Sequence, residues 1–186
     1  MGPEGAEASF GDGGAVPNVE GTALSARELF EGFALQAVDE KGRVAIPADL
    51  RAAAERNSDV RVIVVGRHPL DPCLSAHDLS WSQEKFTRLD DPEQSPYDRA
   101  SANDPSRAKR RAFGAVERAP FDASGRFVLP PFFRAKAGIG KWAFFNGAGE
   151  TFDIWAPETL MRSDEPDNEE IREVCEFLCK QKGVAL

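Results

Sequence analysis

Apolar and polar residues alternate on both sides of a short polar turn at residues 39–42. The alternating apolar residues are Phe33, Leu35 and Ala37 before the turn, and Val44 and Ile46 after it. Alternation with a period of two predicts two β-strands joined as a hairpin, and Gly42 suits a turn position with positive φ. Pro47 ends the second strand. The elements expected next are a helix over 49–56, a buried strand over 60–65 and a short strand over 73–76.

The same series of elements returns 83 residues later. Residues 39–47 read Asp-Glu-Lys-Gly-Arg-Val-Ala-Ile-Pro, and residues 122–130 read Asp-Ala-Ser-Gly-Arg-Phe-Val-Leu-Pro. Each copy continues to a second arginine, Arg51 or Arg134. The elements expected in the second copy are strands over 116–121, 126–129, 142–145 and 151–155, a turn over 122–125, and a helix over 131–137 that Gly138 ends. Such internal repetition indicates a duplicated module.

The two copies are expected to pack on each other. A copy of about 45 residues is too small to bury a good core alone. The hairpins of the two copies would pair or interleave, and both turns would then project together. The residues that this pairing would bury are Val44, Ile46, Phe127 and Leu129. The expected fold class is mixed α+β and β-rich.

Helices are expected between the copies and after them. Ser80 with Gln83 resembles a capping box before a helix over 81–89, and Asp104-Pro105 resembles the start of a second helix after a polar loop over 90–105. Near the C-terminus an apolar helical stripe is expected, capped by Asp167 with Glu170 and ended by Gly183. Its members are Ile171, Val174 and Leu178.

Composition sets the expected divisions of the chain. Residues 1–28 contain six glycines and one aromatic residue, too little apolar surface to offset the entropy of ordering. The predicted divisions are a disordered tail at 1–29, a first β-rich domain at 30–79, a helical insert at 80–112, a second β-rich domain at 113–157 and an acidic helical extension at 158–186.

The acidic charge lies at the two ends of the chain. The net charge is −8. Residues 1–29 carry five acids and one arginine, and residues 158–186 carry eight acids and four cations, so the sequence between them is neutral. A neutral core can still present a basic face to nucleic acid. No apolar run is long enough to span a bilayer, no secretory signal is evident, and three cysteines form no disulfide framework. These features favour a soluble cytoplasmic protein.

Each turn ends in an arginine, Arg43 or Arg126, and the first turn also offers Lys41. A β-ribbon can enter the major groove of DNA, where arginine bonds guanine bidentately. The aspartate of each turn, Asp39 or Asp122, could accept a hydrogen bond from the turn backbone or orient the arginine. The alternative is that the repeated motif is only a well-formed hairpin turn. However, a turn does not require arginine directly after glycine, and the motif occurs twice.

Other candidate chemistry has a simpler structural explanation. The cluster Arg107, Lys109, Arg110 and Arg111 suits either a solvated helix face or phosphate contacts. Metal-ligand residue types occur between His68 and Asp78, but their spacing fits no structural zinc pattern. Cys175 and Cys179, one helical turn apart, are expected to be small apolar residues beside the stripe. No Ser-His-Asp set, phosphate-binding glycine loop or dinucleotide motif is present, so neither a catalytic site nor a cofactor is expected.

The motifs resemble those of the MraZ family, in order, over about residues 30–160. In the first half the matching segments are Phe30-Glu-Gly-Phe, residues 39–47, Pro72-Cys-Leu and a tryptophan at 81. In the second half they are the basic helix, residues 122–130, Ala137-Gly-Ile, and Gly147 to Phe152-Asp-Ile-Trp.

The resemblance implies two tandem SpoVT/AbrB-type swapped-hairpin domains and a bacterial transcriptional regulator. Family members assemble into rings and bind short direct repeats upstream of the division and cell wall gene cluster. The family's DNA-contacting Asp-x-x-x-Arg motif falls on Asp39 with Arg43 and on Asp122 with Arg126. The implied partners are therefore double-stranded DNA and further copies of the chain, in the cytoplasm at the nucleoid, with no membrane or small-molecule substrate.

The chain departs from the family pattern in the segment before residue 29, in the Asp- and Pro-rich insert, at Ser75-Ala-His and in the acidic C-terminal extension. Two other interpretations follow from these features. The first is a protein-interaction module of the same fold, such as an antitoxin, with the C-terminal helix binding a partner. The second is an enzyme or metal protein that uses residues 68–77.

Overall fold

The computed structural model describes residues 27–89 and 105–186. Its centre is a six-stranded sheet in which all neighbouring strands are antiparallel. In spatial order the strands are β1 (Phe33–Ala37), β7 (Trp142–Gly147), β8 (Phe152–Trp155), β4 (Leu74–Asp78), β3 (Val62–Arg67) and β5 (Val116–Pro120). A separate ribbon pairs β2 (Arg43–Ala45) with β6 (Arg126–Val128). The predicted mixed α+β, β-rich class is confirmed.

The strands of the two copies interleave. β1 of the first copy pairs with β7 of the second, β5 of the second pairs with β3 of the first, and β2 pairs with β6. In the central ribbon Val44 lies opposite Phe127. The predicted burial of Val44, Ile46, Phe127 and Leu129 is confirmed, since each is at most 2% exposed. Neither copy therefore closes its own core, as the small size of each copy led us to expect.

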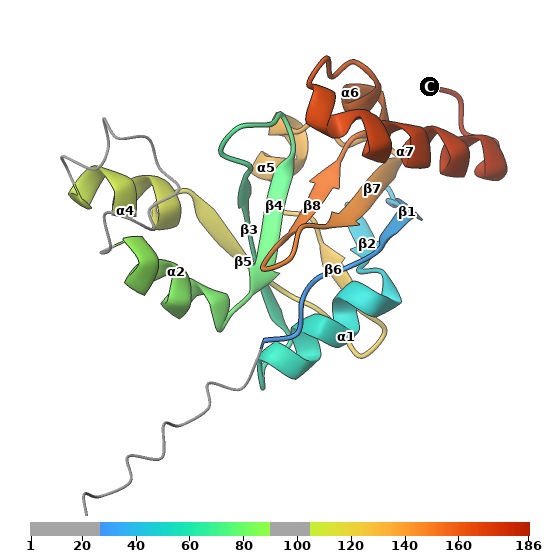
Figure 1. The fold of residues 1–186 in the computed structure, drawn as a ribbon. Helices are drawn as coiled ribbons and strands as arrows, with labels where there is room; N and C mark the ends of the chain where they lie inside the picture. The colour runs from blue at the N-terminus through green and yellow to red at the C-terminus, as the bar shows by residue number, and fades with distance from the viewer. Residues whose placement is uncertain (1–26, 90–104) are drawn as a thin grey trace, which may run out of the picture.

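The helices lie on both faces of the sheet and at one end of it (Figure 1). They are α1 (Ala48–Asn57), α2 (Trp81–Leu89), α4 (Pro105–Phe113), α5 (Pro131–Lys136), α6 (Pro157–Met161) and α7 (Glu169–Lys182), with a 3₁₀ turn, η1 (Pro166–Asn168), before α7. The ribbon β2–β6, α1 and α5 share the main apolar core with one face of the sheet. Helix α7 covers the opposite face, where Leu35, Phe144 and Trp155 pack with Cys175 and Cys179. The predicted C-terminal stripe is thus confirmed as a packing surface.

Several predicted boundaries and caps need correction. The strands expected over 60–65 and 73–76 lie at 62–67 and 74–78. Asp167 does not cap α7, because it belongs to η1 and Asn168 precedes the helix. At α2 the Asp78 carboxylate, rather than a Ser80–Gln83 box, accepts the Trp81 N–H at 3.2 Å. Helix α6 was not predicted. The polar loop over 90–104, with Asp104, and residues 1–26 lie outside the described residues.

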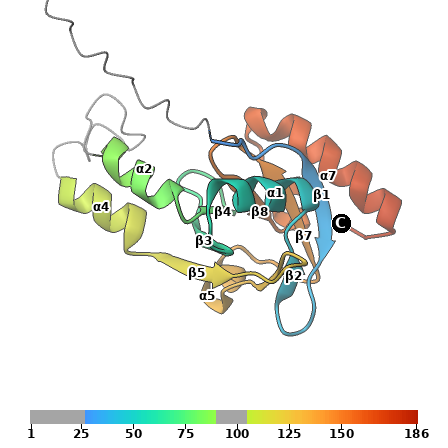
Figure 2. The ribbon, with the colours of Figure 1, turned by 90° about the horizontal axis from the view of Figure 1, so that it is seen from below.

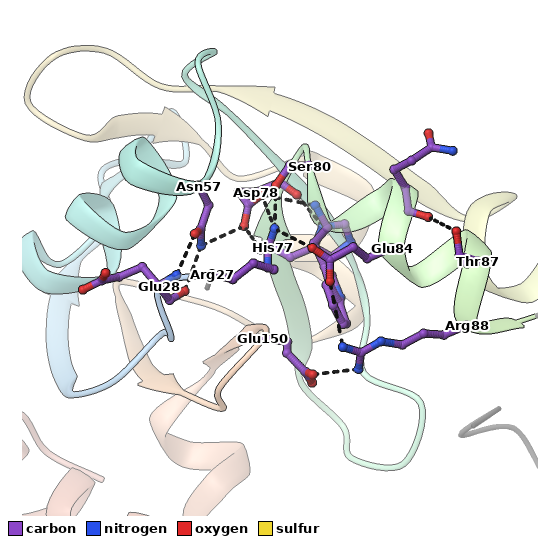
Figure 3. A network of polar contacts seen from close by, with 12 residues as sticks. Arg27, Glu28, Asn57, His77, Asp78, Ser80, Glu84, Thr87, Arg88 and Glu150 are labelled. Atoms are coloured by element: carbon purple, nitrogen blue, oxygen red, sulfur yellow. Dashed lines mark hydrogen bonds and ion pairs between the residues drawn. The ribbon is translucent and has the colours of Figure 1, made fainter. Parts of the chain in front are cut away.

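Arg27 and Glu28 take part in a network of polar contacts with α1 and with the end of β4 (Figure 3). The Arg27 guanidinium pairs with the fully buried Asp78 carboxylate, hydrogen-bonds Ser80 Oγ at 2.5 Å and lies over the Trp81 ring. Glu28 exchanges hydrogen bonds with Asn57. Because burial removes water from the Asp78 carboxylate, its charge needs a partner within the protein. Arg27, distant in sequence, is that partner. Arg27 and Glu28, at the end of the expected tail, therefore contact the folded part of the chain.

Candidate nucleic-acid interface

The first turn joins β1 to the ribbon. The Gly42 N–H donates to the Asp39 carbonyl at 2.9 Å, and the Asp39 N–H donates to the Arg43 carbonyl at 3.0 Å. The Asp39 Oδ1 accepts the Arg43 N–H at 2.8 Å. Gly42 has φ of 79°, a conformation that favours glycine. The aspartate and the glycine therefore fix the backbone that carries Arg43.

The second turn repeats these contacts. The Gly125 N–H donates to the Asp122 carbonyl at 2.8 Å, and Gly125 has φ of 77°. The Asp122 Oδ1 accepts the Ser124 N–H at 2.8 Å and the Arg126 N–H at 2.9 Å. The repeated sequence thus gives two turns with one backbone design. In both turns the pKa of the aspartate is lowered, and the largest cause is the hydrogen bond from the backbone N–H of the following arginine.

The two arginine side chains are exposed but differ in their partners. Arg43 Nε lies 2.6 Å from Asp39 Oδ2 in an ion pair across the turn. Among residues 27–89 and 105–186, no hydrogen bond or ion pair involves the Arg126 guanidinium. Lys41 is also exposed. The two turns together present three cations to solvent.

Each turn is held by the other copy. The Ile46 N–H donates to the Gly125 carbonyl and the Leu129 N–H to the Gly42 carbonyl, both at 2.9 Å. These reciprocal bonds place the two turns at the ends of the β2–β6 ribbon. A ribbon of this kind suits the major groove of DNA, which admits two-stranded β-structure.

The second arginine of each copy also packs against the opposite turn. Arg51 lies against Gly125 and sends Nη1 toward the Ala123 carbonyl at 3.4 Å, whereas Arg134 lies against Gly42. Arg134 also lines a shallow hollow of about 290 Å³ beside Lys41 and Gly42. We did not predict a role for these two arginines. Their repetition at equal distance from Pro47 and Pro130 was the signal in the sequence.

The basic cluster of α4 lies away from the turns. Figures 1 and 2 show α2 and α4 projecting together at one end of the molecule, opposite the β1–β2 turn. Arg107, Arg110 and Arg111 are exposed, while Lys109 lies over the Phe86 ring at 4.4 Å. The four cations therefore belong to a second surface, distinct from the turns.

The residues between His68 and Asp78 form separate structural contacts. Burial lowers the pKa of His77 to about 4, and its Nδ1–H donates to the Asp78 carbonyl at 2.8 Å. Burial raises the pKa of the Cys73 thiol. No group of three or more metal-ligating side chains occurs within the described parts of the chain. Nor does any helix there have the length and apolar character to cross a membrane.

Curated relatives share most of the chain, although no family model matches it. A protein from Rhodospirillum rubrum is 30% identical over 76% of this chain and 88% of its own length. One from Thermomicrobium roseum is 36% identical over 70% of this chain and 83% of its own. A third, from Coxiella burnetii, is 33% identical over 68% of this chain and 79% of its own length. All three are named transcriptional regulator MraZ, and none is named as an enzyme.

Proposed function

The chain belongs to the MraZ family of transcriptional regulators, and from this premise we propose that its two turns bind promoter DNA. The observation that carries the proposal is the pair of arginine-bearing turns at the ends of one ribbon, with matched hydrogen bonds. Arg43, Arg126 and Lys41 make base or phosphate contacts. Asp39 and Asp122, with Gly42 and Gly125, hold the turns in the conformation that presents those cations.

The proposed architecture is a tandem SpoVT/AbrB-like swapped-hairpin fold. The interleaved pairing of β1 with β7 and of β3 with β5 supports it. Its two domains are residues 30–79 and 113–157, joined by the insert 80–112 and followed by the extension 158–186. Because each domain borrows strands from the other, the two turns keep a fixed spacing.

The proposed regulator acts as a homo-oligomer in the cytoplasm, at the nucleoid. One copy offers few base contacts, and several subunits on short direct repeats multiply them through effective concentration. A ring-like assembly would meet this need, and the division and cell wall gene cluster is the proposed target. The α4 cations Arg107, Lys109, Arg110 and Arg111 at most add phosphate contacts, since they lie at the other end of the molecule.

Substitution of the turn arginines tests the proposal. Duplexes selected in vitro by the wild-type chain serve as the probe, and fluorescence anisotropy at physiological salt measures binding. Loss of a bidentate arginine costs about 1–3 kcal/mol, so Arg43→Ala and Arg126→Ala together should remove specific binding. Particle size in light scattering should stay unchanged. Arg56→Ala, which removes an exposed arginine of helix α1, is the matched control. Wild-type affinity in the double variant would contradict the proposal.

One observation favours a second function for the C-terminal helix. Helix α7 exposes Glu169, Glu170, Glu173 and Glu176, together with Phe177 at 63% exposure. An acidic surface with one exposed aromatic side chain suits a basic protein partner. Glutamate-to-glutamine changes at 169, 170 and 173 combined with Phe177→Ser test this surface. The combined variant should bind DNA with unchanged affinity. A protein partner that crosslinks to the wild-type chain in cells should no longer crosslink to the variant. Truncation would be unsuitable, because α7 covers the sheet.

A further inference from the structure

The two turns differ in how they use their aspartate. In the first turn the Asp39 carboxylate binds both the backbone N–H and the guanidinium of Arg43. In the second turn Asp122 Oδ1 accepts only backbone N–H groups, from Ser124 and Arg126. The backbones match, so the turn geometry does not explain the difference.

The second arginines of the two copies also differ in their partners. The Arg134 guanidinium donates through Nε to the Ile139 carbonyl and through Nη2 to the Gly140 carbonyl, both at 3.1 Å, within its own copy. Those carbonyls are accessible because α5 ends at Lys136 and Gly138 turns the chain with φ of 67°. In the first copy α1 continues to Asn57, so the residues equivalent to 139 and 140 are still helical. Arg51 has no such local loop. It packs on Gly125 as Arg134 packs on Gly42, but its Nη1 donates to the Ala123 carbonyl of the opposite turn rather than to its own copy.

The charge of Arg51 therefore acts on the second turn. Its Nη1 lies 3.4 Å from the Ala123 carbonyl and its side chain packs on Gly125. Backbone hydrogen bonds from Arg126 and Ser124 do most to keep the pKa of Asp122 low, and attraction to Arg126 and then to Arg51 adds to this effect. At the first turn the Arg134 guanidinium also lies against Gly42, but it donates to the Ile139 and Gly140 carbonyls, and Arg43 itself is the cation that Asp39 attracts.

We propose that Arg51 is a positioning residue that supplies counter-charge to Asp122 and leaves Arg126 as the principal DNA-contacting arginine. Arg43, held by Asp39, contributes less until DNA displaces that carboxylate. The two halves of the pseudo-symmetric unit thus read DNA unequally. This inference rests on the proposed DNA-binding function and assigns distinct roles within it.

A double-mutant cycle tests the role of Arg51. Arg51→Met keeps the aliphatic packing on Gly125 but removes the charge, which allows Asp122 to capture Arg126. Because an exposed ion pair is weak, DNA affinity should fall about two- to fivefold. Adding Asp122→Asn retains the acceptor for the backbone N–H groups and should restore DNA affinity. The gain in affinity in the Arg51→Met background should exceed the change that Asp122→Asn causes in the wild type. Arg51→Lys should bind nearly as well as the wild type.

The first turn provides the matched control. Asp39→Asn frees Arg43 and should tighten binding by more than Asp122→Asn does alone, although both remove one negative charge. In the Arg134→Met background, Asp39→Asn should change DNA affinity by the same amount as it does in the wild type, so the first turn should show no rescue. The probe is the duplex selected by the wild-type chain, and the unfolding midpoint of each variant reports folding.

The possible outcomes separate this inference from the proposed function. If the wild-type chain selects no duplex, the proposed function fails and the inference fails with it. If the wild type binds but Arg51→Met binds equally well, only the inference fails. If Arg51→Met binds weakly and Asp122→Asn does not restore affinity, Arg51 contacts DNA or serves folding alone, and the inference is again overturned. Rescue that requires Asp122→Asn supports it, because a purely structural defect would persist.

Discussion

The guanidinium of Arg134 lies so close to Gly42 that a Cβ atom on this glycine would be 3.1 Å from Nη1. The second turn mirrors the relationship, since a Cβ on Gly125 would be 2.9 Å from Arg51 Cδ. Both glycines also have positive φ. The repeated glycine and the repeated second arginine thus form two reciprocal contacts between the copies, and each turn depends on the half to which it does not belong.

Alanine at the two turn glycines should destabilise the fold unequally. Gly125→Ala should lose about 2–3 kcal/mol and Gly42→Ala about 1–2 kcal/mol, from positive φ and crowding together. The first loss is larger because the Cβ at 125 would also lie 3.3 Å from the Ile46 carbonyl. Urea unfolding at fixed protein concentration measures both changes.

Two further glycines separate the causes of that loss. Gly149 has φ of 80° but no neighbour within 4 Å of a Cβ, so Gly149→Ala isolates backbone strain. Gly140 has open space and no positive φ, so Gly140→Ala should change stability by less than about 0.5 kcal/mol. Equal losses at 42, 125 and 149 would show that the arginines do not crowd the turns.

The Arg27–Asp78 pair should matter far more than a neighbouring exposed pair. Asp78 is fully buried and the Arg27 side chain is 15% exposed. Arg27→Met leaves a buried carboxylate with only neutral donors, and the free energy of unfolding should fall by about 2–4 kcal/mol. Arg56→Met breaks the exposed pair with Glu28 and should cost less than about 1 kcal/mol. Similar losses in the two variants would contradict this ranking.

The local pattern of the sequence predicted the strands on both sides of each turn and the packing of one copy on the other. It did not predict that β1 and β2 pair with β7 and β6 rather than with each other, nor the long-range polar contacts. Alternation around 39–42 and its repeat gave the strands, because side chains on a half-buried strand follow period two. The end of β4 was missed because His77 and Asp78 are polar. Asp78 is buried there with Arg27, distant in sequence, as its ion-pair partner, and the buried His77 donates to the Asp78 carbonyl. Helix α6 was missed because its five residues are too few to show a helical period.

The candidate site was predictable only in part, for a related reason. The turn cations are adjacent in sequence to the glycines that shape the turns, so a local motif identifies them. The contact of Arg51 with the 122–125 turn joins residues far apart in the chain, and only the fold brings them together. Its dependence on the length of α1 relative to α5 could not be seen in the repeat itself.

Two buried groups should give the stability opposite dependences on pH. Burial raises the pKa of Asp153 from 3.8 to about 6, and Asp153 Oδ1 and Asn146 Oδ1 lack hydrogen-bond partners among the described residues. The folded state therefore binds the Asp153 proton more tightly than the unfolded chain, so this group lowers stability as pH rises from about 4 to 6. The nearby His68 and Asp71 act on this carboxyl with opposite signs.

His77 acts in the other direction. Burial lowers its pKa from 6.5 to about 4, so the unfolded chain binds the proton more tightly between those values. His77 therefore raises stability as pH increases from about 4 to 6.5. The turn aspartates, whose pKa values are lowered from 3.8, change stability mainly below that range. The two buried groups should largely cancel in the wild type, which predicts a nearly flat stability profile across this window.

Substitution of either group should expose the other. Asp153→Asn supplies an amide donor for Asn146 and should stabilise the fold by about 1–3 kcal/mol at pH 7, while its stability rises steadily from pH 4 to 6.5. His77→Asn keeps a donor for the Asp78 carbonyl, and its stability should instead fall from pH 4 to 6. Urea unfolding at several pH values measures both slopes. A wild-type slope in Asp153→Asn would show that Asp153 is ionised at its usual pKa, which requires a donor that reaches its buried Oδ1.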